Sequence, residues 1–146
     1  MIVEPNEIKH IKGISDCPSG VTSGCFDLLH FYHLHYLLRC KAECDVLIVG
    51  VDSDELVKKN KGKYPAVPEY HRVAMIAALR CVDVAFILRS LDDLRTATTG
   101  THFLFRNSHQ VYGSEVIQSD AELVIIEDVE EVQSTSALKQ KIKNDQ

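Results

Sequence analysis

The chain has 146 residues, a length that suits one domain built around a hydrophobic core. Hydrophobic residues make up 45% and charged residues 25%, which is the balance of a folded globular protein and excludes a disordered chain. The net charge of −5 argues against a nucleic-acid partner, because a surface that binds nucleic acid is normally basic.

The sequence gives no sign of a membrane partner or of secretion. No apolar run approaches the roughly 18 residues of a membrane span, and the amino terminus lacks the basic start and apolar core of a signal peptide. We therefore expect a cytoplasmic protein. Five cysteines without the spacing of a disulfide framework predict reduced thiols. Cys40 and Cys44 would share a helix face, but no second ligand pair accompanies them, so no protein-bound metal site is predicted.

Residues 1–18 precede the first regular element and form an N-terminal extension. Pro5, Asn6, Gly13 and Pro18 predict a mostly irregular path. A packing arm and an oligomer contact are both open as roles for this segment. One domain is expected to span residues 19–146.

Strands and helices alternate along the remainder of the chain. The predicted strands are Gly20–Gly24, Asp45–Val51, Val82–Leu88, His102–Phe105 and Glu122–Glu127, and the predicted helices are His33–Cys44, Glu69–Arg80, Leu91–Thr96 and Ser136–Lys143. Such alternation predicts a parallel sheet with helices on both faces. The predicted fold class is α/β, a Rossmann-like three-layer sandwich with a five-stranded parallel sheet.

The junction between the first strand and the first helix is a candidate phosphate site. At such a junction the first helical N–H groups lack partners and the helix dipole is positive. His30 and His33 flank the predicted helix start and would add donors for charge that develops on a phosphate oxygen. A single histidine is more often structural or solvated. This pair, however, follows Gly24 and Asp27 at the carboxyl end of a strand, where open parallel sheets usually bind ligands.

The segment Gly24–His33, with the letters G-C-F-D-L-L-H-x-x-H, resembles the signature of the cytidylyltransferase-like nucleotidyltransferases. Its first seven letters are most similar to the nucleotidyl-transfer domain of bacterial ADP-heptose synthases, and glycerol-3-phosphate cytidylyltransferases are close relatives. Further matches continue to Ile142 in the family's order and spacing. The resemblance implies that Gly24, Cys25 and Phe26 contact the nucleotide through their backbone.

Residues 57–65 hold four lysines and a glycine, and we expect them to form a loop after the second strand. By itself a lysine cluster is usually a solvated face. The resemblance implies instead that a lysine here reaches the triphosphate as a mobile point charge. Lys61, directly before Gly62, is the better match, and Lys63 is the alternative.

Two later segments also match the family. The pair His71-Arg72 opens a helix, and the resemblance implies that Arg72 is a phosphate ligand; the alternative is an ordinary surface arginine in a first helical turn. Near the carboxyl end, Ser134, Thr135 and Ser136 resemble the element that closes over the β- and γ-phosphates. The alternative is that Ser134 or Thr135 merely caps the last helix.

Two departures from the family pattern bear on function. Tyr32 stands where the motif has glycine, so its side chain must rotate away, stack on the base or obstruct the site. An obstructed site would leave a catalytically degenerate nucleotide-binding protein. Arg106 lies where relatives carry a glycine–aspartate segment, and it is either a ligand of the acceptor's phosphate or a plain surface arginine. The loop Asn107–Asp120 is expected to line the acceptor pocket.

The resemblance implies one kind of reaction. A phosphorylated sugar or polyol, of the heptose 1-phosphate or glycerol 3-phosphate type, attacks the α-phosphate of ATP or CTP, and pyrophosphate leaves. His30 and His33 would stabilise the reacting phosphate, while Lys61 and Arg72 hold the triphosphate. Mg²⁺ is expected to accompany the nucleotide, and relatives suggest a homodimer.

Overall fold

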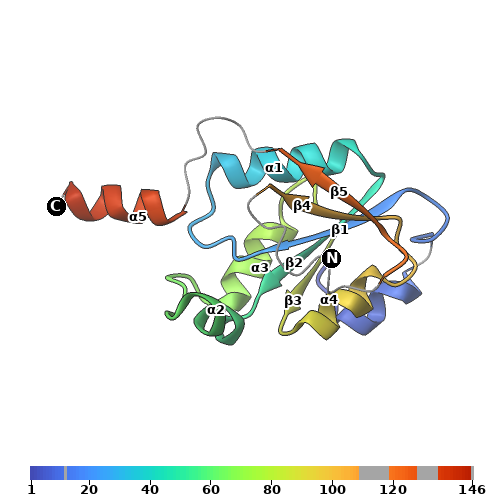
Figure 1. Ribbon diagram of the computed structural model, residues 1–146, viewed down its shortest axis with the longest axis horizontal. Helices are drawn as coiled ribbons and strands as arrows, with labels where there is room; N and C mark the ends of the chain where they lie inside the picture. Colours follow the sequence, from blue (N-terminus) through green and yellow to red (C-terminus); the bar gives the residue numbers. More distant parts are fainter. Residues whose placement is uncertain (12, 109–118, 128–134, 146) are drawn as a thin grey trace.

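A computed structural model describes residues 1–11, 13–108, 119–127 and 135–145, with the backbone alone for 135–138 (Figure 1). One sheet in the order β3-β2-β1-β4-β5 contains the strands β1 (Ser19–Gly24), β2 (Val46–Asp52), β3 (Val84–Leu88), β4 (Phe103–Asn107) and β5 (Glu122–Ile126). Every pair of neighbouring strands is parallel. The predicted Rossmann-like α/β fold with five parallel strands is therefore confirmed.

Helices cover both faces of the sheet, which explains why its central strands are almost continuously apolar. On one face, α1 (Phe31–Ala42) and α3 (Glu69–Ala77) pack on a core that includes Val49 and Val51. On the other face, α4 (Leu91–Thr98) and the 3-10 helix η1 (Pro5–His10) cover a second core that includes Val21 and Ile48. These two layers fix the strand ends that carry the candidate site.

The N-terminal extension packs against the domain. Ile2 forms a parallel bridge with Ala85 of β3. Ile8 of η1 and Ile14 are buried in the second core. Glu4 forms an ion pair with Arg89 at 3.3 Å. Of the two roles left open for this segment, the structure shows that of a packing arm.

The lysine-rich segment is helical where the sequence predicted a loop. Ser53 caps the start of the helix α2 (Asp54–Lys61), because its hydroxyl accepts a hydrogen bond from the N–H of Leu56 at 3.1 Å. It ends at Gly62, which has the left-handed φ of 77° that suits glycine at a helix end. The loop prediction is wrong up to Lys61, because a helix this polar shows no apolar stripe and is recognised only by its caps.

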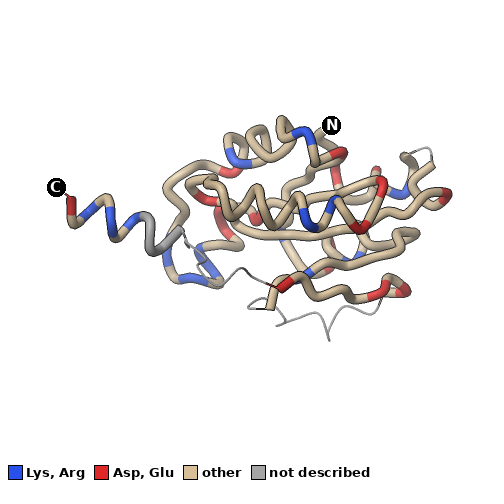
Figure 2. The backbone as a smooth tube through the Cα atoms, turned by 90° about the horizontal axis from the view of Figure 1, so that it is seen from above, with Lys and Arg blue, Asp and Glu red and all other residues tan. Residues whose placement is uncertain are grey.

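The C-terminal helix α5 (Thr135–Asn144) lies apart from the sheet and its covering helices (Figure 1). Its Lys139 forms an ion pair with Asp27, which ties the helix to the turn after β1. The basic stretches of α2 and α5 lie at the same end of the molecule (Figure 2). None of the helices in the described ranges has both the length and the apolar character needed to cross a membrane.

Candidate active site

The turn between β1 and α1 has an unusual backbone. Phe26 and Leu28 adopt φ angles of 52° and 49°, in the left-handed region that non-glycine residues rarely occupy. Such conformations persist only where the surroundings enforce them, and they cluster at functional sites. A Cβ on Gly24 would lie 3.1 Å from the ring of Phe26, so the ring closes against a position that only glycine fits easily.

Asp27 fixes this turn from within. Its side chain is 4% exposed, and its carboxylate accepts hydrogen bonds from the N–H groups of Ala66 and Val67, both at 2.9 Å. Lys139 completes the set at 2.5 Å. Burial alone raises the pKa of Asp27, but these three partners lower it below its ordinary value. The ionised carboxylate therefore joins the β1–α1 turn, the segment before α3, and α5.

His30 and His33 lie together at the start of α1. Their rings are stacked with centroids 3.9 Å apart and an interplanar angle of 20°. The Nδ1 atom of His33 accepts a hydrogen bond from the backbone N–H of His30 at 3.3 Å. The ring of Phe26 meets His33 edge-on at 5.6 Å. The two imidazoles thus share one environment, which includes the strained turn.

The environment favours the neutral form of both imidazoles. Burial, the neighbouring His30 and the charge of Lys61 lower the pKa of His33 to about 4, against a smaller opposing effect of Asp27. Burial also lowers the pKa of His30. Because Nδ1 of neutral His33 accepts a hydrogen bond, its proton lies on Nε2, which can donate.

The ring nitrogens of His30 are not fully hydrogen-bonded in the described part of the chain. Both are buried, and neither makes a hydrogen bond of normal geometry within the described residues, although the His30 side chain faces the backbone N–H of His33 in a capping-box arrangement. Buried polar atoms in folded proteins are normally hydrogen-bonded. An oxygen of a bound ligand would satisfy this imidazole.

Lys61, the last residue of α2, acts on His33 and also belongs to a neighbouring cleft. Burial raises the pKa of the Cys25 thiol and of the Asp52 carboxyl, and the positive charge of Lys61 partly opposes that rise. The same charge helps to lower the pKa of His33, so Lys61 is within electrostatic reach of all three groups. It also lines the cleft. Lys63, the alternative from the sequence, is exposed and does not line the cleft.

Arg72 is an internal anchor. Only 1% of it is exposed, so the alternative of a surface arginine is wrong. Its guanidinium donates to the carbonyls of Val67 (2.8 Å), Cys25 (2.8 Å) and Asp52 (2.6 Å) and to the carboxylate of Asp54 (2.7 Å). Four of its five N–H groups thus donate to partners within the described part of the chain. Its main effect is to hold the turn after β1 against the end of β2.

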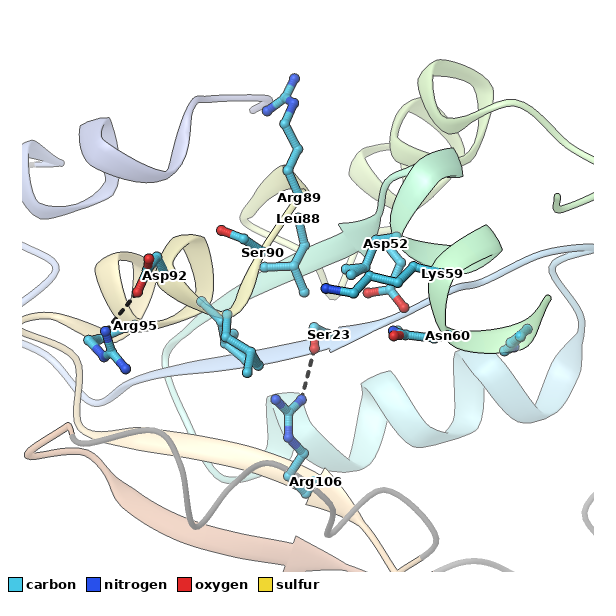
Figure 3. Close-up of a pocket in the computed structure, with 15 residues that line it drawn as sticks. Ser23, Asp52, Lys59, Asn60, Leu88, Arg89, Ser90, Asp92, Arg95 and Arg106 are labelled. Carbon is cyan, nitrogen blue, oxygen red and sulfur yellow. Dashed lines mark hydrogen bonds and ion pairs between the residues drawn. The ribbon is translucent and has the colours of Figure 1, made fainter. Parts of the chain in front are cut away.

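A cleft of about 1030 Å³ opens between α2 and α4 at the carboxyl edge of the sheet (Figure 3). Ser23 of β1, Asp52 of β2, Leu88 of β3 and Arg106 of β4 contribute to its lining. Arg106 is 6% exposed and donates from Nη1 to the hydroxyl of Ser23 at 2.8 Å. Its burial rules out the alternative of a plain surface arginine.

Tyr32 does not separate the two imidazoles. Its ring meets His30 edge-on at 6.3 Å and the neighbouring Phe31 at 5.5 Å, beside the stacked pair. The side chain therefore lies beside the histidine pair and not between its two rings.

Some predicted site residues are not placed. Thr135 and Ser136 open α5, but their side chains, and Ser134 altogether, lie outside the described residues. Most of the predicted acceptor loop, at 109–118, is outside them as well.

The fit of Mg²⁺ to the site can be judged from the side chains present. The described residues contain no group of three or more His, Cys, Asp or Glu that could hold a metal ion. Mg²⁺ in nucleotide sites is bound largely by phosphate oxygens and water, with one or two carboxylates. The site therefore fits a magnesium ion that arrives with a triphosphate and is held mainly by phosphate oxygens and water.

Ser23 and Asp52 were not among the residues singled out from the sequence. Ser23 is the next-to-last residue of the predicted strand Gly20–Gly24, and Asp52 directly follows the predicted strand Asp45–Val51. A polar residue at that position, in a sheet predicted to be parallel, is the signal that could have identified them, because the carboxyl ends of parallel strands meet at one edge.

Comparison with known proteins identifies the family and its relatives. Residues 21–141 match the family model described as cytidylyltransferase-like. The bifunctional protein HldE of Helicobacter pylori (strain P12) is 39% identical over 124 residues, and that of Bradyrhizobium sp. (strain ORS 278) is 35% identical over 133 residues. These alignments cover 84% and 87% of this chain but 27% of each relative, so the chain spans about a quarter of their length.

A solved structure has a similar fold. The crystal structure of the lipopolysaccharide core biosynthesis protein from Thermoplasma volcanium GSS1 superposes with a TM-score of 0.66 at 25% identity. The match covers 80% of this chain and 99% of that one.

Proposed function

The chain belongs to the cytidylyltransferase-like family, and we propose that it is a nucleotidyltransferase which transfers a nucleoside monophosphate from ATP or CTP to a phosphorylated sugar or polyol, releasing pyrophosphate. The acceptor is of the heptose 1-phosphate or glycerol 3-phosphate type. The similarity to HldE proteins favours the sugar phosphate.

One observation carries the proposal. Two neutral imidazoles are stacked at the start of α1, and one of them has buried ring nitrogens that make no hydrogen bond of normal geometry among the described residues. Groups of this kind can donate hydrogen bonds to oxygens of the α-phosphate as charge grows on them in the transition state. Because the imidazoles are uncharged before the nucleotide binds, they add no repulsion toward the nearby Lys61.

The reaction needs no covalent enzyme intermediate. An oxygen of the acceptor's phosphate bonds to the α-phosphorus, the bond from that phosphorus to the bridging oxygen breaks, and pyrophosphate leaves with the electron pair. His30 and His33 would hold the α-phosphate, and Lys61 would follow the charge that passes to the leaving group. Mg²⁺, bound mainly by the triphosphate, would neutralise part of this charge.

The remaining nucleotide contacts come from the turn and from α5. The backbone of Gly24, Cys25 and Phe26 would border the nucleotide, with Arg72 keeping the carbonyl of Cys25 in place. Ser134, Thr135 and Ser136 would close over the outer phosphates.

The proposal is tested by titrating the protein with MgATP and MgCTP and then measuring pyrophosphate release with heptose 1-phosphate and with glycerol 3-phosphate. Replacing His33 by Ala should reduce turnover about 10²- to 10³-fold, the scale of losing one transition-state donor. His71→Ala, at an exposed position on α3, is the matched control and should retain activity. A loss below about threefold at His33 would remove it from the mechanism.

A second function is favoured by Tyr32 at the glycine position of the motif. A side chain at this point narrows the space beside His30, and full obstruction would leave a protein that binds nucleotide without chemistry. Tight nucleotide binding with no pyrophosphate from either acceptor would support this alternative. The proposed homodimer, which is suggested by the resemblance, is tested by sedimentation equilibrium.

A further inference from the structure

Arg106 is a buried cation without an anionic partner. It is 6% exposed, and it makes no ion pair with any residue that the structure describes. Its Nε has no hydrogen-bond partner in the same ranges, although Nη1 donates to Ser23. Buried charges in proteins are normally paired, because taking a charge out of water is expensive. Burial accordingly lowers the pKa of Arg106. A bound anion would supply the missing partner.

The strand side chains that line the cleft lie on the same face of the sheet as the core under α4 and η1. Alternate residues of a strand point to the same face, and the strands under α4 and η1 place apolar residues there until their last positions. Polar residues then follow on that face, as in the pairs Val21 and Ser23 of β1, Ile48 and Asp52 of β2, and Leu104 and Arg106 of β4. The sheet order places β1 between β2 and β4. Ser23 lies beside Arg106, and Asp52 lies two residues beyond Gly50, the partner of Ser23 on β2, so the three polar residues form a staggered row at the carboxyl edge.

The two ends of this row have opposite chemistry. Arg106 offers a planar fork of donors that suits a phosphate. Asp52 offers only acceptor oxygens, and its carboxylate makes no hydrogen bond within the described ranges (Figure 3). A carboxylate in this position attracts the hydroxyl groups of a ligand and repels a second phosphate.

We propose that this cleft is the acceptor site of the reaction proposed above, and that it takes a phosphomonoester of a polyhydroxylated carbon skeleton. The phosphate binds Arg106 and Ser23, and a hydroxyl group of the skeleton donates to Asp52. This inference rests on the proposed function in one respect, namely that the ligand is the acceptor of that reaction. The chemistry of the ligand follows from the residues that line the cleft.

The location of the cleft suits a phosphate that acts as the nucleophile. Ser23 directly precedes Gly24, whose neighbour in space is the ring of Phe26, and that ring contacts His33. Lys61 acts electrostatically on both His33 and Asp52. An acceptor phosphate on Arg106 therefore lies toward the histidine pair across Gly24, and its hydroxyl-bearing part extends toward α2 and α4.

The first test is calorimetric titration of wild-type protein and the Arg106→Gln variant with inorganic phosphate and with heptose 1-phosphate. Loss of a charge-assisted, forked contact should weaken both ligands about 10- to 100-fold. The affinity for MgATP or MgCTP should change less than about threefold, since the nucleotide lies on the other side of Gly24. Arg80→Gln, which removes the same charge at an exposed position, is the control and should leave every affinity unchanged.

The second test uses Asp52→Asn, for which the two ligands should respond in opposite directions. Heptose 1-phosphate should bind about three- to tenfold more weakly, because a hydroxyl acceptor is lost. Inorganic phosphate should bind equally or more tightly, because a negative charge near Arg106 is removed. Asp45→Asn at an exposed position is the control. A purely structural role for Asp52 would shift both ligands in the same direction.

The outcomes separate this inference from the proposed function. Wild-type affinity of a folded Arg106→Gln variant for both phosphates overturns the inference, even if pyrophosphate is released. Phosphate binding that depends on Arg106, without pyrophosphate from any acceptor, supports the cleft assignment and rejects the enzymatic proposal. If Arg106→Gln does not fold, Arg106→Lys replaces it, with an expected loss of about tenfold, because lysine keeps the charge but lacks the fork.

Discussion

The neutral state of His33 leads to a measurable dependence of stability on pH. His33 is less basic in the folded protein than in the unfolded chain, because burial, His30 and Lys61 lower its pKa from 6.5 to about 4. At pH values between these two pKa values, His33 is mostly protonated in the unfolded chain and mostly neutral in the folded protein. Stability is therefore fully present above about pH 6.5 and falls as the pH drops toward 4.

The size of this effect follows from the two pKa values. At about 1.4 kcal/mol per unit of pKa, the difference between 6.5 and about 4 corresponds to roughly 3.5 kcal/mol. Water reaches part of the ring and screens its charge, so we expect about 1–2 kcal/mol of the free energy of unfolding to be lost. His30 adds a smaller loss in the same direction, because burial lowers its pKa as well.

The measurement is urea unfolding of the wild type and of His33→Gln at several pH values from 7.5 to 4.5, followed by circular dichroism. Glutamine keeps an acceptor for the backbone N–H of His30, so the helix start is preserved. The stability of the variant should decline by about 1–2 kcal/mol less than that of the wild type over this range. His71→Gln, on the exposed side of α3, should follow the wild type. Identical profiles for wild type and His33→Gln would refute the burial argument.

Three further outcomes are expected. Gly50→Ala should destabilise the protein by about 1–3 kcal/mol in urea unfolding, because the new Cβ would lie 2.7 Å from the ring of Phe86; a change within about 0.5 kcal/mol would contradict this packing. Asp27→Asn should cost about 1–3 kcal/mol by the same assay and weaken nucleotide binding, whereas Lys139→Met, which removes one of the three partners, should cost less. Tyr32→Gly should raise turnover in the pyrophosphate assay if the ring obstructs the nucleotide, and lowered turnover would assign the ring a positive role.

Much of the fold and part of the site can be predicted from the sequence. Alternation of apolar strands with amphipathic helices depends on local periodicity, so the five strands were predicted to within two residues at each end. The pair His30 and His33 was predicted because both residues lie in one segment. The polar helix α2 was missed, since its only signals are the cap at Ser53 and the left-handed Gly62.

Other site features depend on contacts that no local pattern contains. Arg72 could be expected to contact a phosphate from its motif, yet the folded chain surrounds its guanidinium with three carbonyls and Asp54. Whether a given arginine meets a ligand or a carbonyl depends on the path of distant segments.

The sequence by itself determined the order of the elements, the strand-to-helix junction with its two imidazoles, and the family pattern, because each of these is written in contiguous residues. Only the tertiary structure decided that Ser23 and Arg106, 83 residues apart in the chain, share a hydrogen bond. It likewise decided that Arg106 is buried without an anion among the described residues, facing a cleft that also holds Asp52. The physical reason is that strand order, set by long-range packing of helices on both faces, brings separate strand ends to one edge of the sheet.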